Sequence, residues 1–321
     1  MSGTGISRTG GGAGDGTDGA RVVLITGGAS GLGAAGALEL RRRGWHPVLV
    51  DQDRAGLDAV SAQVAAIAGD AQGALAVQAD VTDLGACEAA VQATLTRHGR
   101  LDCVWANAGM ASFGPLAHTD PGAWRRCIDV NVSGVFHTVR AALPPLLVQR
   151  GQVCITASVA SFAHPPLMSA YAASKAAVEA MANAWRIELA PHGVGVGVVH
   201  ASWVGTPMVS DGAQHPAFTR LRDTSPPPLR QVMSAEDAAR RIADGIERRD
   251  RRIWVPGWVR WLHRLRALLH TPLGERELQR AAPELESLYL QVLREQGAMA
   301  SSYAPRELQR ALDREAGPLS G

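Results

Sequence analysis

Lysine is almost absent from this chain, because 31 of its 32 basic residues are arginine and Lys175 is the only lysine. Asparagine is also scarce and occurs only at positions 107, 131 and 183. A GC-rich genome would explain the preference for arginine codons, but it would not explain where the single exception lies. We therefore expect these rare residue types to mark positions at which the chemistry of the protein requires them.

Features typical of several other protein classes are also missing. No apolar run approaches the roughly 20 residues that cross a bilayer, and the start of the chain lacks the apolar core of a signal peptide. The four cysteines contain no C-x-x-C pair, so we expect reduced thiols, a cytoplasmic protein and no metal site. The net charge is +2 with acidic residues among the basic ones, which gives no reason to expect a nucleic-acid partner.

The sequence divides into three parts. Residues 1–20 contain eight glycines and few apolar side chains, which predicts a disordered tail. Residues 21–256 alternate short β-branched runs with longer helical stretches, the pattern of a parallel sheet with helices on both faces. Residues 257–321 form a C-terminal extension with a helical pattern. The predicted fold is therefore α/β, a Rossmann-type doubly wound parallel sheet of about seven strands with a helical extension.

The boundaries of the elements follow from the same pattern. Strands are predicted at 22–26, 46–50, 74–79, 101–106, 152–156, 193–199 and 252–255, and helices at 31–43, 54–68, 83–97, 122–149 and 170–190. Ser234 is expected to be the N-cap of a further helix. Residues 207–230 are rich in proline and show no period, so we expect a mobile flap over a site.

A glycine-rich turn directly follows the first predicted strand. It reads Thr26-Gly27-Gly28-Ala29-Ser30-Gly31-Leu32-Gly33 and leads into an alanine-rich helix. Glycine at 27, 31 and 33 permits a tight turn, lets backbone approach a pyrophosphate, and lets the helix pack on the strand. A glycine cluster alone is a weak signal, but its position between strand and helix favours a dinucleotide site.

An acidic residue ends the second predicted strand. Asp51 lies 18 residues after Gly33, close to the offset of about 20 residues expected for a carboxylate that binds the adenosine ribose diol. A carboxylate there would repel the 2′-phosphate of NADP, so we expect NAD, although Arg54 or the run 41–43 could reach that phosphate. An ordinary turn residue at a strand end is the alternative interpretation of Asp51.

A tyrosine and the single lysine lie four residues apart in the segment YAASK. This spacing places Tyr171 and Lys175 on one face of a helix. A cation near a phenol lowers its pKa from about 10, so that the phenol can exchange a proton with an alcohol near neutral pH. Taken in isolation, a solvated pair on a helix surface would explain the two residues equally well.

Several motifs, in this order and spacing, resemble the short-chain dehydrogenase/reductase family, in its short single-domain branch. They are TGGASGLG at 26–33, Asp80-Val81, Asn107-Ala108-Gly109, Asn131, Ser158 and YAASK at 171–175. The resemblance covers about residues 21–256, and two of the three asparagines and the only lysine fall on its functional positions. It implies hydride transfer between NAD(H) and a secondary alcohol or ketone.

The resemblance also implies roles for individual residues. Tyr171 would be the general acid/base, Lys175 would lower its pKa and bind the nicotinamide ribose, Ser158 would stabilise the substrate oxygen, and Asn131 would hold a water in a proton relay. The residues implied in cofactor binding are Gly27, Ser30, Gly31, Leu32, Gly33, Asp51, Asp80, Val81, Asn107, Ala108, Gly109, Tyr171, Lys175, Val204 and Thr206.

The sequence departs from the family after the sixth predicted strand. Ala201-Ser202 stand where the family usually has Pro-Gly, so we expect a differently shaped nicotinamide end, where the resemblance implies that Thr206 holds the carboxamide. The expected substrate segments are Met110 to Leu116, Val159 to Met168 and Ser202 to Phe218. They are largely apolar, which favours a hydrophobic alcohol or ketone as the small-molecule substrate.

Two other functions are compatible with the fold. A module that binds NAD(H) without turnover would not need Ser158, Tyr171 and Lys175 together. An epimerase or dehydratase of the related longer branch is expected to have a different glycine spacing and a substantial substrate domain. We therefore favour catalysis, and from the family we expect a homodimer or homotetramer formed through the fourth and fifth helices.

The C-terminal extension begins with an amphipathic pattern. Trp258, Trp261, Leu262, Leu265, Leu268 and Leu269 recur at helical spacing in 257–270. Arginines lie on the other side, which predicts one amphipathic helix. Its apolar face is expected to pack on the core or a neighbouring subunit, where it could roof the substrate pocket, with peripheral membrane contact as the alternative.

Overall fold

A computed structural model of the chain describes residues 19–68, 73–225, 227–297 and 300. The predicted disordered tail lies outside the described residues except for positions 19 and 20, and so do residues 301–321 of the extension. Among the described residues, no helix combines the length and apolar character needed to cross a bilayer.

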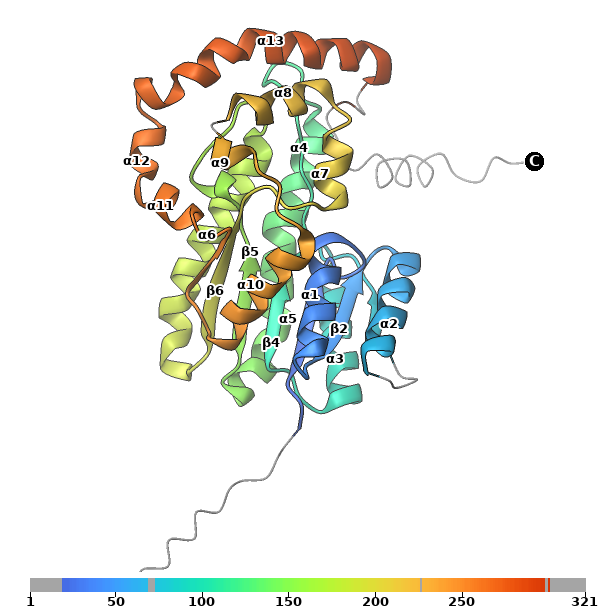
Figure 1. Cartoon of the computed structure of the whole chain (residues 1–321). Coiled ribbons are helices and arrows are strands. Elements are labelled where there is room, and N and C mark those ends of the chain that lie inside the picture. Colours follow the sequence, from blue (N-terminus) through green and yellow to red (C-terminus); the bar gives the residue numbers. More distant parts are fainter. Residues whose placement is uncertain (1–18, 69–72, 226, 298–299, 301–321) are drawn as a thin grey trace, which may run out of the picture.

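Seven parallel strands form one sheet in the order β3-β2-β1-β4-β5-β6-β7 (Figure 1). They are β1 (Val22–Thr26), β2 (His46–Asp51), β3 (Leu75–Gln78), β4 (Cys103–Ala106), β5 (Gln152–Thr156), β6 (Gly195–Ala201) and β7 (Arg252–Val255). The order reverses between β1 and β4, where the carboxyl ends of the strands border the crevice in which such sheets bind ligands. The predicted Rossmann-type sheet is confirmed.

Helices cover both faces of the sheet. One face carries α1 (Gly31–Arg42), α2 (Arg54–Ala68) and α10 (Ala235–Glu247), and the other carries α3 (Leu84–His98), α5 (Gly134–Gln149) and α6 (Ser169–Leu189). Successive side chains of β1 alternate between the two cores: Val22 and Leu24 lie on the α3 side, and Val23 and Ile25 on the α1 side. A strand buried on both faces therefore reads as a continuous apolar run.

The helix predicted at 122–149 is divided. It consists of α4 (Pro121–Ile128), a π-helical turn (Asp129–Ser133) and α5. The wider turn places Asn131 in the core, where its side chain is fully buried. Isolated π turns inside α-helices often lie at functional sites.

Residues 207–230 are more regular than the sequence predicted. They form α7 (Pro207–Gly212), α8 (Pro216–Thr224) and α9 (Pro227–Arg230). The expectation of a segment without periodic structure was wrong, because proline is tolerated in the first turn of a helix, where its missing N–H is not needed. The N-cap predicted at Ser234 is confirmed, since its Oγ accepts a hydrogen bond from the Asp237 N–H (3.0 Å).

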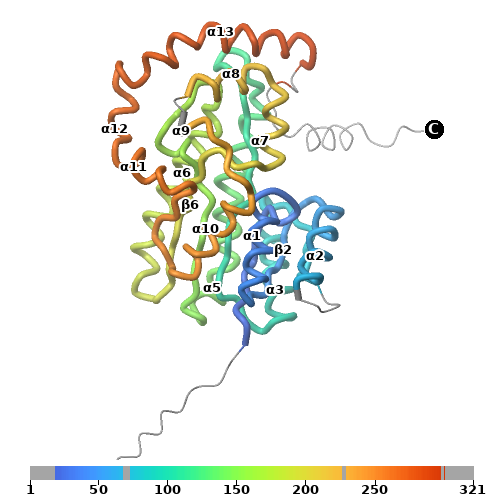
Figure 2. Tube along the Cα trace, viewed as in Figure 1, coloured from blue at the N-terminus to red at the C-terminus, as the bar shows by residue number. Residues whose placement is uncertain are grey.

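The C-terminal extension leaves the sheet and crosses over its carboxyl end (Figures 1 and 2). The prediction of a single amphipathic helix at 257–270 was wrong, because the helix is interrupted at Leu265. The two parts are α11 (Val259–Arg264) and α12 (Arg266–Leu269). The longer α13 (Pro272–Gln296) follows and packs on α8. Two short 3-10 turns, Val159–Ser161 and Ala190–His192, complete the fold.

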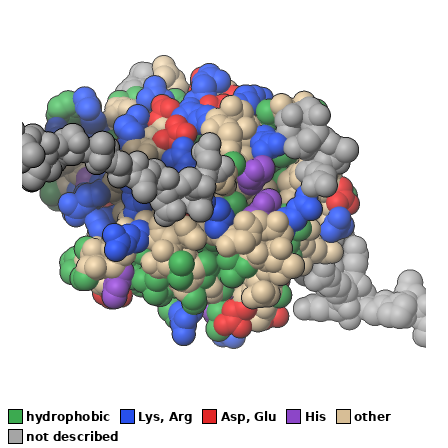
Figure 3. Space-filling view, turned by 90° about the horizontal axis from the view of Figure 1, so that it is seen from below, with side chains coloured by type: hydrophobic (Ala, Val, Ile, Leu, Met, Phe, Trp, Pro, Cys, Tyr) green, Lys and Arg blue, Asp and Glu red, His purple; other side chains and the backbone are tan. Residues whose placement is uncertain are grey.

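The face at the amino ends of the strands is chemically mixed. Seen from below, blue basic and red acidic side chains are interspersed over it (Figure 3). The opposite edge, where the strands end and the extension crosses, carries the candidate site residues.

Candidate active site

The glycine-rich turn joins β1 to α1 at the carboxyl edge of the sheet. Gly27 (φ +67°) and Gly31 (φ +54°) have left-handed backbone conformations, which other residues rarely adopt. A Cβ at Gly33 would lie 2.1 Å from the carbonyl oxygen of Gly27. Among the described residues, the amides of the first turn of α1 receive no side-chain cap from Ser30. This cradle fits a phosphate group at the helix N-terminus.

Hydrogen bonds hold this turn against the end of β4. The N–H groups of Asn107 (3.0 Å) and Ala108 (3.1 Å) donate to Thr26 Oγ1. The side chain of Asn107 donates to the Thr26 carbonyl oxygen (3.1 Å) and accepts from Thr156 Oγ1 (3.0 Å). The side chain of Asn107 therefore fixes the turn, and the backbone of 107–109 is the part that faces the crevice. Sequence reasoning assigned no role to Thr156, because nothing in its spacing distinguishes it from other threonines.

Asp51 ends β2 next to this turn. Its two carboxylate oxygens accept hydrogen bonds from the N–H groups of Ala29 (3.1 Å) and Asp53 (3.0 Å). A carboxylate oxygen can accept more than one hydrogen bond, so Asp51 can stabilise the turn and still bind a ribose hydroxyl. Both interpretations of Asp51 therefore fit the structure.

The arginines considered for a 2′-phosphate are engaged elsewhere. Arg54 pairs with Asp58 (2.6 Å), and Arg43 pairs with Asp244 on α10 (2.7 Å). Arg42 pairs with Glu39, and Arg41 lies 3.1 Å from a ring nitrogen of His46. To bind a 2′-phosphate, any of these side chains would first have to give up such a contact.

Asp80 and Val81 follow β3. Asp80 Oδ1 accepts hydrogen bonds from the N–H (2.9 Å) and the hydroxyl (2.8 Å) of Thr82. Val81 is buried, and its carbonyl oxygen lies 3.0 Å from Nδ1 of His137. The contact with Thr82 also supports a purely structural capping role for Asp80, so its adenine contact stays a prediction.

Tyr171 and Lys175 lie one turn apart on α6, as their spacing predicted. Lys175 is 3% exposed, and its Nζ donates to the Thr156 carbonyl oxygen (2.8 Å) and lies 5.6 Å from the centroid of the Tyr171 ring. A Cβ at Gly109 would lie 3.4 Å from Nζ and 3.2 Å from Asn131 Oδ1. The loop after β4, the π turn and α6 therefore meet at the lysine ammonium.

The buried side chain of Asn131 joins this loop to α6. Its Oδ1 accepts from the Met110 N–H, and its Nδ2 donates to the Met110 carbonyl oxygen, both at 2.8 Å. Nδ2 also donates to Ser174 Oγ (2.9 Å), next to Lys175. These contacts give Asn131 a positioning role; its proposed part in a proton relay stays a prediction.

Burial controls the protonation of the catalytic pair. It raises the pKa of Tyr171 to about 12, although a hydrogen bond with Ser158 opposes the rise. Burial also lowers the pKa of Lys175 to about 8. From the sequence we expected the lysine to lower the pKa of the tyrosine, but burial of the Tyr171 side chain is the largest influence and raises this pKa.

Ser158 and Thr206 follow two neighbouring strands at the carboxyl edge of the sheet. Ser158 follows β5, and its Oγ accepts from the Ala160 N–H (3.1 Å) and donates to the Ala201 carbonyl oxygen (3.3 Å). Thr206 follows β6, and its Cβ lies 3.2 Å from where a Cβ of Gly31 would be. Despite the departure at Ala201-Ser202, Thr206 therefore lies against the glycine-rich turn, after the buried Val204.

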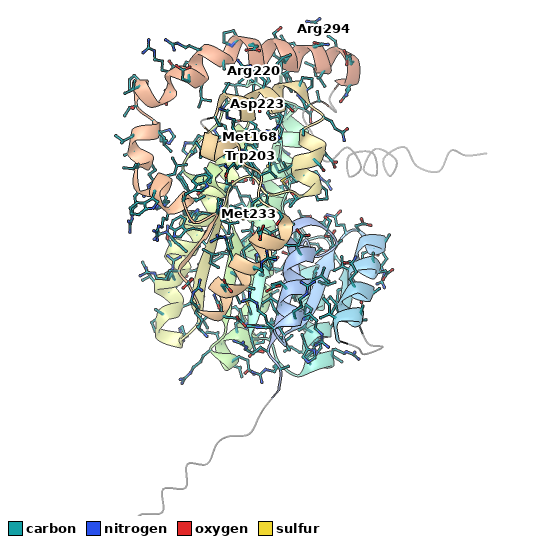
Figure 4. All side chains as sticks on the ribbon, in the orientation of Figure 1. Met168, Trp203, Arg220, Asp223, Met233 and Arg294 are labelled. Atoms are coloured by element: carbon teal, nitrogen blue, oxygen red, sulfur yellow. The ribbon has the colours of Figure 1, made fainter. Side chains whose placement is uncertain are left out.

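An apolar cluster surrounds the partly buried Tyr171. Figure 4 shows Met168 and Trp203 between α8 and the carboxyl end of the sheet. The cluster combines parts of all three predicted substrate segments with α13, and its members include Ala111, Phe113, Leu167, Met168, Trp203, Met208, Ala217, Phe218, Leu221, Ala281, Leu285, Tyr289 and Val292. Sequence reasoning did not include α13, because its residues are far from the motifs in the chain.

Tyr289 anchors α13 over this cluster. It is fully buried, its hydroxyl donates to the His118 carbonyl oxygen (3.3 Å), and its ring stacks on His215 at 5.7 Å. His215 also meets the edge of Phe113 (5.0 Å), and its Nδ1 accepts from the Ala217 N–H at the start of α8 (3.2 Å). We call α8 and α13, which together cover this cluster, the roof. An ion pair between Arg220 of α8 and Glu284 of α13 (2.9 Å) joins the two helices on their outer side.

Comparisons with known proteins agree with this geometry. A family model described as short chain dehydrogenase matches residues 21–216. (-)-trans-carveol dehydrogenase from Rhodococcus erythropolis is 35% identical over 211 residues, which cover 62% of this chain and 76% of that protein.

Solved structures show the same similarity. Levodione reductase superposes with a TM-score of 0.67 at 30% identity, covering 73% of this chain and 94% of that one. A short chain dehydrogenase/reductase from Burkholderia phymatum in complex with NAD superposes with a TM-score of 0.68 at 27% identity, covering 79% and 96%.

Proposed function

Because the chain belongs to the short-chain dehydrogenase/reductase family, we propose that it transfers a hydride between NAD(H) and a hydrophobic secondary alcohol or ketone. Oxidoreduction of alcohols and ketones with a nicotinamide cofactor follows from the family. The observation that carries the residue roles is the convergence of Ser158, Tyr171 and Lys175 beside the glycine-rich turn.

The cofactor would lie along the carboxyl edge of the sheet. The cradle of Gly27, Gly31 and Gly33 would hold its pyrophosphate. Asp51 would bind the adenosine ribose, and Asp80 and Val81 would contact the adenine. Ser30, Leu32 and the 107–109 backbone would line it, and Lys175, Val204 and Thr206 would contact the nicotinamide end. When bound, the nicotinamide supplies the hydride chemistry, and the protein supplies position and electrostatics.

Side chains of the protein would carry out the proton transfer. With its pKa raised to about 12, Tyr171 stays protonated at neutral pH, so its hydroxyl can donate a proton to a carbonyl oxygen. Ser158 Oγ would donate a hydrogen bond to the same oxygen and stabilise the charge that develops there. The Lys175 ammonium stays largely protonated at pH 7, because its lowered pKa is about 8. In the alcohol direction the base would be the Tyr171 phenolate, so the raised pKa favours carbonyl reduction at neutral pH and alcohol oxidation at higher pH.

The preference for NAD over NADP rests on charge. The Asp51 carboxylate would repel a 2′-phosphate, and Arg54 and Arg43 are held by acidic partners. The relative crystallised with NAD has the same fold, which is compatible with this preference.

The apolar cluster around Tyr171 supports a hydrophobic substrate. The names of two relatives, a carveol dehydrogenase and a levodione reductase, are those of enzymes for such compounds. A cyclic alcohol or ketone with little charge would suit a site walled by Phe113, Trp203 and Phe218.

We also propose a cytoplasmic homodimer or homotetramer. Phe136, Leu147 and Val148 on α5 and Ile187 on α6 are exposed apolar side chains on the helices through which the family assembles. Light scattering at micromolar concentration tests this, and a monomeric mass would contradict it.

Tyr171→Phe tests the catalytic proposal. The ring keeps its packing, so NAD should bind with unchanged affinity, while kcat should fall by about 10²–10⁴-fold because the proton-transfer group is lost. Turnover of apolar alcohols and ketones is followed by the absorbance of the reduced nicotinamide. Wild-type turnover in the variant would remove Tyr171 from its role, and NAD binding without turnover in the wild-type chain would favour a non-catalytic module.

A further inference from the structure

Residues 257–273, which run from just after β7 into the first turn of α13, carry side chains that neither the fold nor the proposed active site uses. We call this segment the strap. Its apolar residues Trp261, Leu265, Leu268 and Leu273 are 51%, 55%, 60% and 79% exposed. Single exposed apolar side chains are ordinary, but four so close together in the chain indicate an interaction surface.

The strap is firmly attached beneath this surface. His263 Nε2 lies 3.3 Å from the Glu179 carboxylate on α6, and Glu179 also accepts from Ser161 Oγ (2.6 Å). His270 Nε2 lies 3.1 Å from the Phe162 carbonyl oxygen. The strap is therefore fixed to the loop that leads away from Ser158, and its outward apolar side chains do not result from poor packing.

Arginines surround the exposed side chains. The guanidinium groups of Arg260 and Arg264 lie 4.9 and 4.7 Å from the centroid of the Trp261 ring, so both stack on the same tryptophan. In the part of the chain that the structure describes, neither arginine forms an ion pair with a carboxylate. The surface thus combines apolar character with uncompensated positive charge.

A hollow beside Trp261 extends this positive charge. It is lined by Arg241, Asp244, Arg248, Asp250, Arg252, Ile253, Trp254, Gly257, Trp258, Arg260 and Trp261. Its two carboxylates are already paired, Asp244 with Arg43 (2.7 Å) and Asp250 with Arg248 (2.9 Å). Over the described ranges, Arg241 and Arg252 form no hydrogen bond or salt bridge with a carboxylate, and Arg241 interacts with Asp237 only through longer-range attraction. The hollow is therefore suited to an anionic group such as a phosphate.

We propose that the strap docks the protein on an anionic membrane surface. The leucines and Trp261 would enter the boundary between headgroups and acyl chains, and the arginines would contact lipid phosphates. Interfacial membrane helices commonly combine tryptophan, leucine and arginine in this way. This surface goes beyond the proposed activity, and it would place the substrate loop 159–168 close to a source of apolar compounds.

Charge argues against a second copy of the chain as the occupant. In a two-fold interface the same patch meets itself, so the arginines at 260 and 264 would face the same arginines. Like charges brought together in this way are unfavourable. An anionic lipid surface complements both the positive charge and the apolar ridge.

The test is sedimentation of the full-length protein with vesicles of phosphatidylcholine, with and without phosphatidylglycerol. We expect binding that requires phosphatidylglycerol and weakens with salt. Arg260→Glu/Arg264→Glu should reduce the partition coefficient by at least about tenfold, because each arginine near an anionic surface contributes substantially to binding. Leu265→Ser/Leu268→Ser should reduce it by about tenfold through loss of apolar insertion.

Matched controls lie away from the strap. Arg97→Glu at the end of α3 reverses one exposed positive charge, and Val148→Ser at the end of α5 removes one exposed apolar side chain; both should keep vesicle binding. The strap variants and Arg97→Glu should retain turnover without vesicles and the wild-type mass in light scattering.

Three results would overturn the proposal. They are failure of the wild-type chain to bind anionic vesicles, equal loss of binding in the control variants, and strap variants that change the oligomeric mass but not vesicle binding. The last result would assign the strap to a protein interface. Vesicle binding is measured without substrate, so its failure is distinguishable from failure of the proposed catalysis.

Discussion

The two halves of the proposed active site are built in different ways. The cofactor half consists of backbone at the ends of β1, β2 and β4, held by short-range contacts such as those of Thr26 and Asn107. The substrate half consists of apolar side chains from α8, α13 and three loops that are far apart in the sequence. The first half requires particular residue types, whereas the second requires only suitable volume and polarity. Mutations should therefore affect the halves in different ways.

Gly33→Ala should have the largest effect, and it should be confined to the cofactor half. The added Cβ would lie 2.1 Å from a backbone oxygen, so the turn must shift. The affinity for NAD should therefore fall by about tenfold to a hundredfold. Titration of the purified variant with NAD measures this. Gly257→Ala is the control, because a Cβ there meets only Arg241 at 3.7 Å. Unchanged NAD affinity in Gly33→Ala would show that the turn adapts freely.

Tyr289→Ala should affect the substrate half alone. Truncating a buried aromatic side chain leaves a cavity that costs about 3–5 kcal/mol where the site cannot collapse. We expect α13 to loosen and KM for an apolar substrate to rise about tenfold, while NAD affinity stays within about twofold. Tyr289→Phe is the control, since it keeps the buried ring and removes the hydroxyl that donates to the His118 carbonyl oxygen. If NAD affinity fell as much as KM rose, the two halves would not be separable.

Asp51→Ala should change cofactor choice without weakening the roof. Losing one charged hydrogen-bond acceptor is worth about 1.5–3 kcal/mol, so the ratio of kcat/KM for NAD to that for NADP should narrow by about 10- to 100-fold. Asp58→Ala is the companion variant, because it releases Arg54 and leaves Asp51 in place. A wild-type preference for NADP, or a strong gain of NADP activity in Asp58→Ala, would mean that Arg54 reaches the 2′-phosphate.

The smallest effect should be a pH dependence of the free energy of unfolding, caused by His215 where α8 meets α13. Burial lowers the pKa of His215 to about 4, so the folded state binds fewer protons than the unfolded state between that pH and about 6.5. The free energy of unfolding should therefore fall as pH drops through this window. A protonated ring would also lose Nδ1 as the acceptor for the Ala217 N–H.

His215→Asn keeps an N-cap side chain and removes the titration. Between pH 7 and pH 4.5, the free energy of unfolding should fall by about 1 kcal/mol less in this variant than in the wild-type protein. The difference is this small because the His215 ring is partly solvated. Urea unfolding at several pH values measures the difference. Parallel pH profiles for the two proteins would show that His215 does not respond to acid in this range.

The same contrast explains which parts of the molecule could be predicted from the sequence. The strands at 22–26, 152–156 and 252–255 have the predicted bounds, because buried parallel strands produce uninterrupted apolar runs. The glycine turn and the Tyr171–Lys175 pair were also found, because each depends on local spacing.

A flap at 207–230 and a roof from 257–270 were predicted from the sequence, but the helical form of the flap and the part played by α13 depend on long-range packing. Pro207 and Pro216 suggested a loop, whereas each begins a helix whose apolar side depends on α13. The break at Leu265 and the burial of Tyr289 likewise depend on contacts distant in sequence. The pKa of Tyr171 was expected to fall and instead rises, because burial is a property of the folded surroundings.

The position of α13 has a consequence for how such an enzyme can diverge. Within the described residues, this helix packs on α8 and α12 and reaches the loop at His118, at a distance from the motifs of the sheet. Substitutions along it can therefore reshape the set of accepted alcohols while hydride and proton transfer stay intact. Substrate range can then drift under selection at little risk to catalysis, and exchanging α13 between homologous enzymes becomes a practical route to altered selectivity.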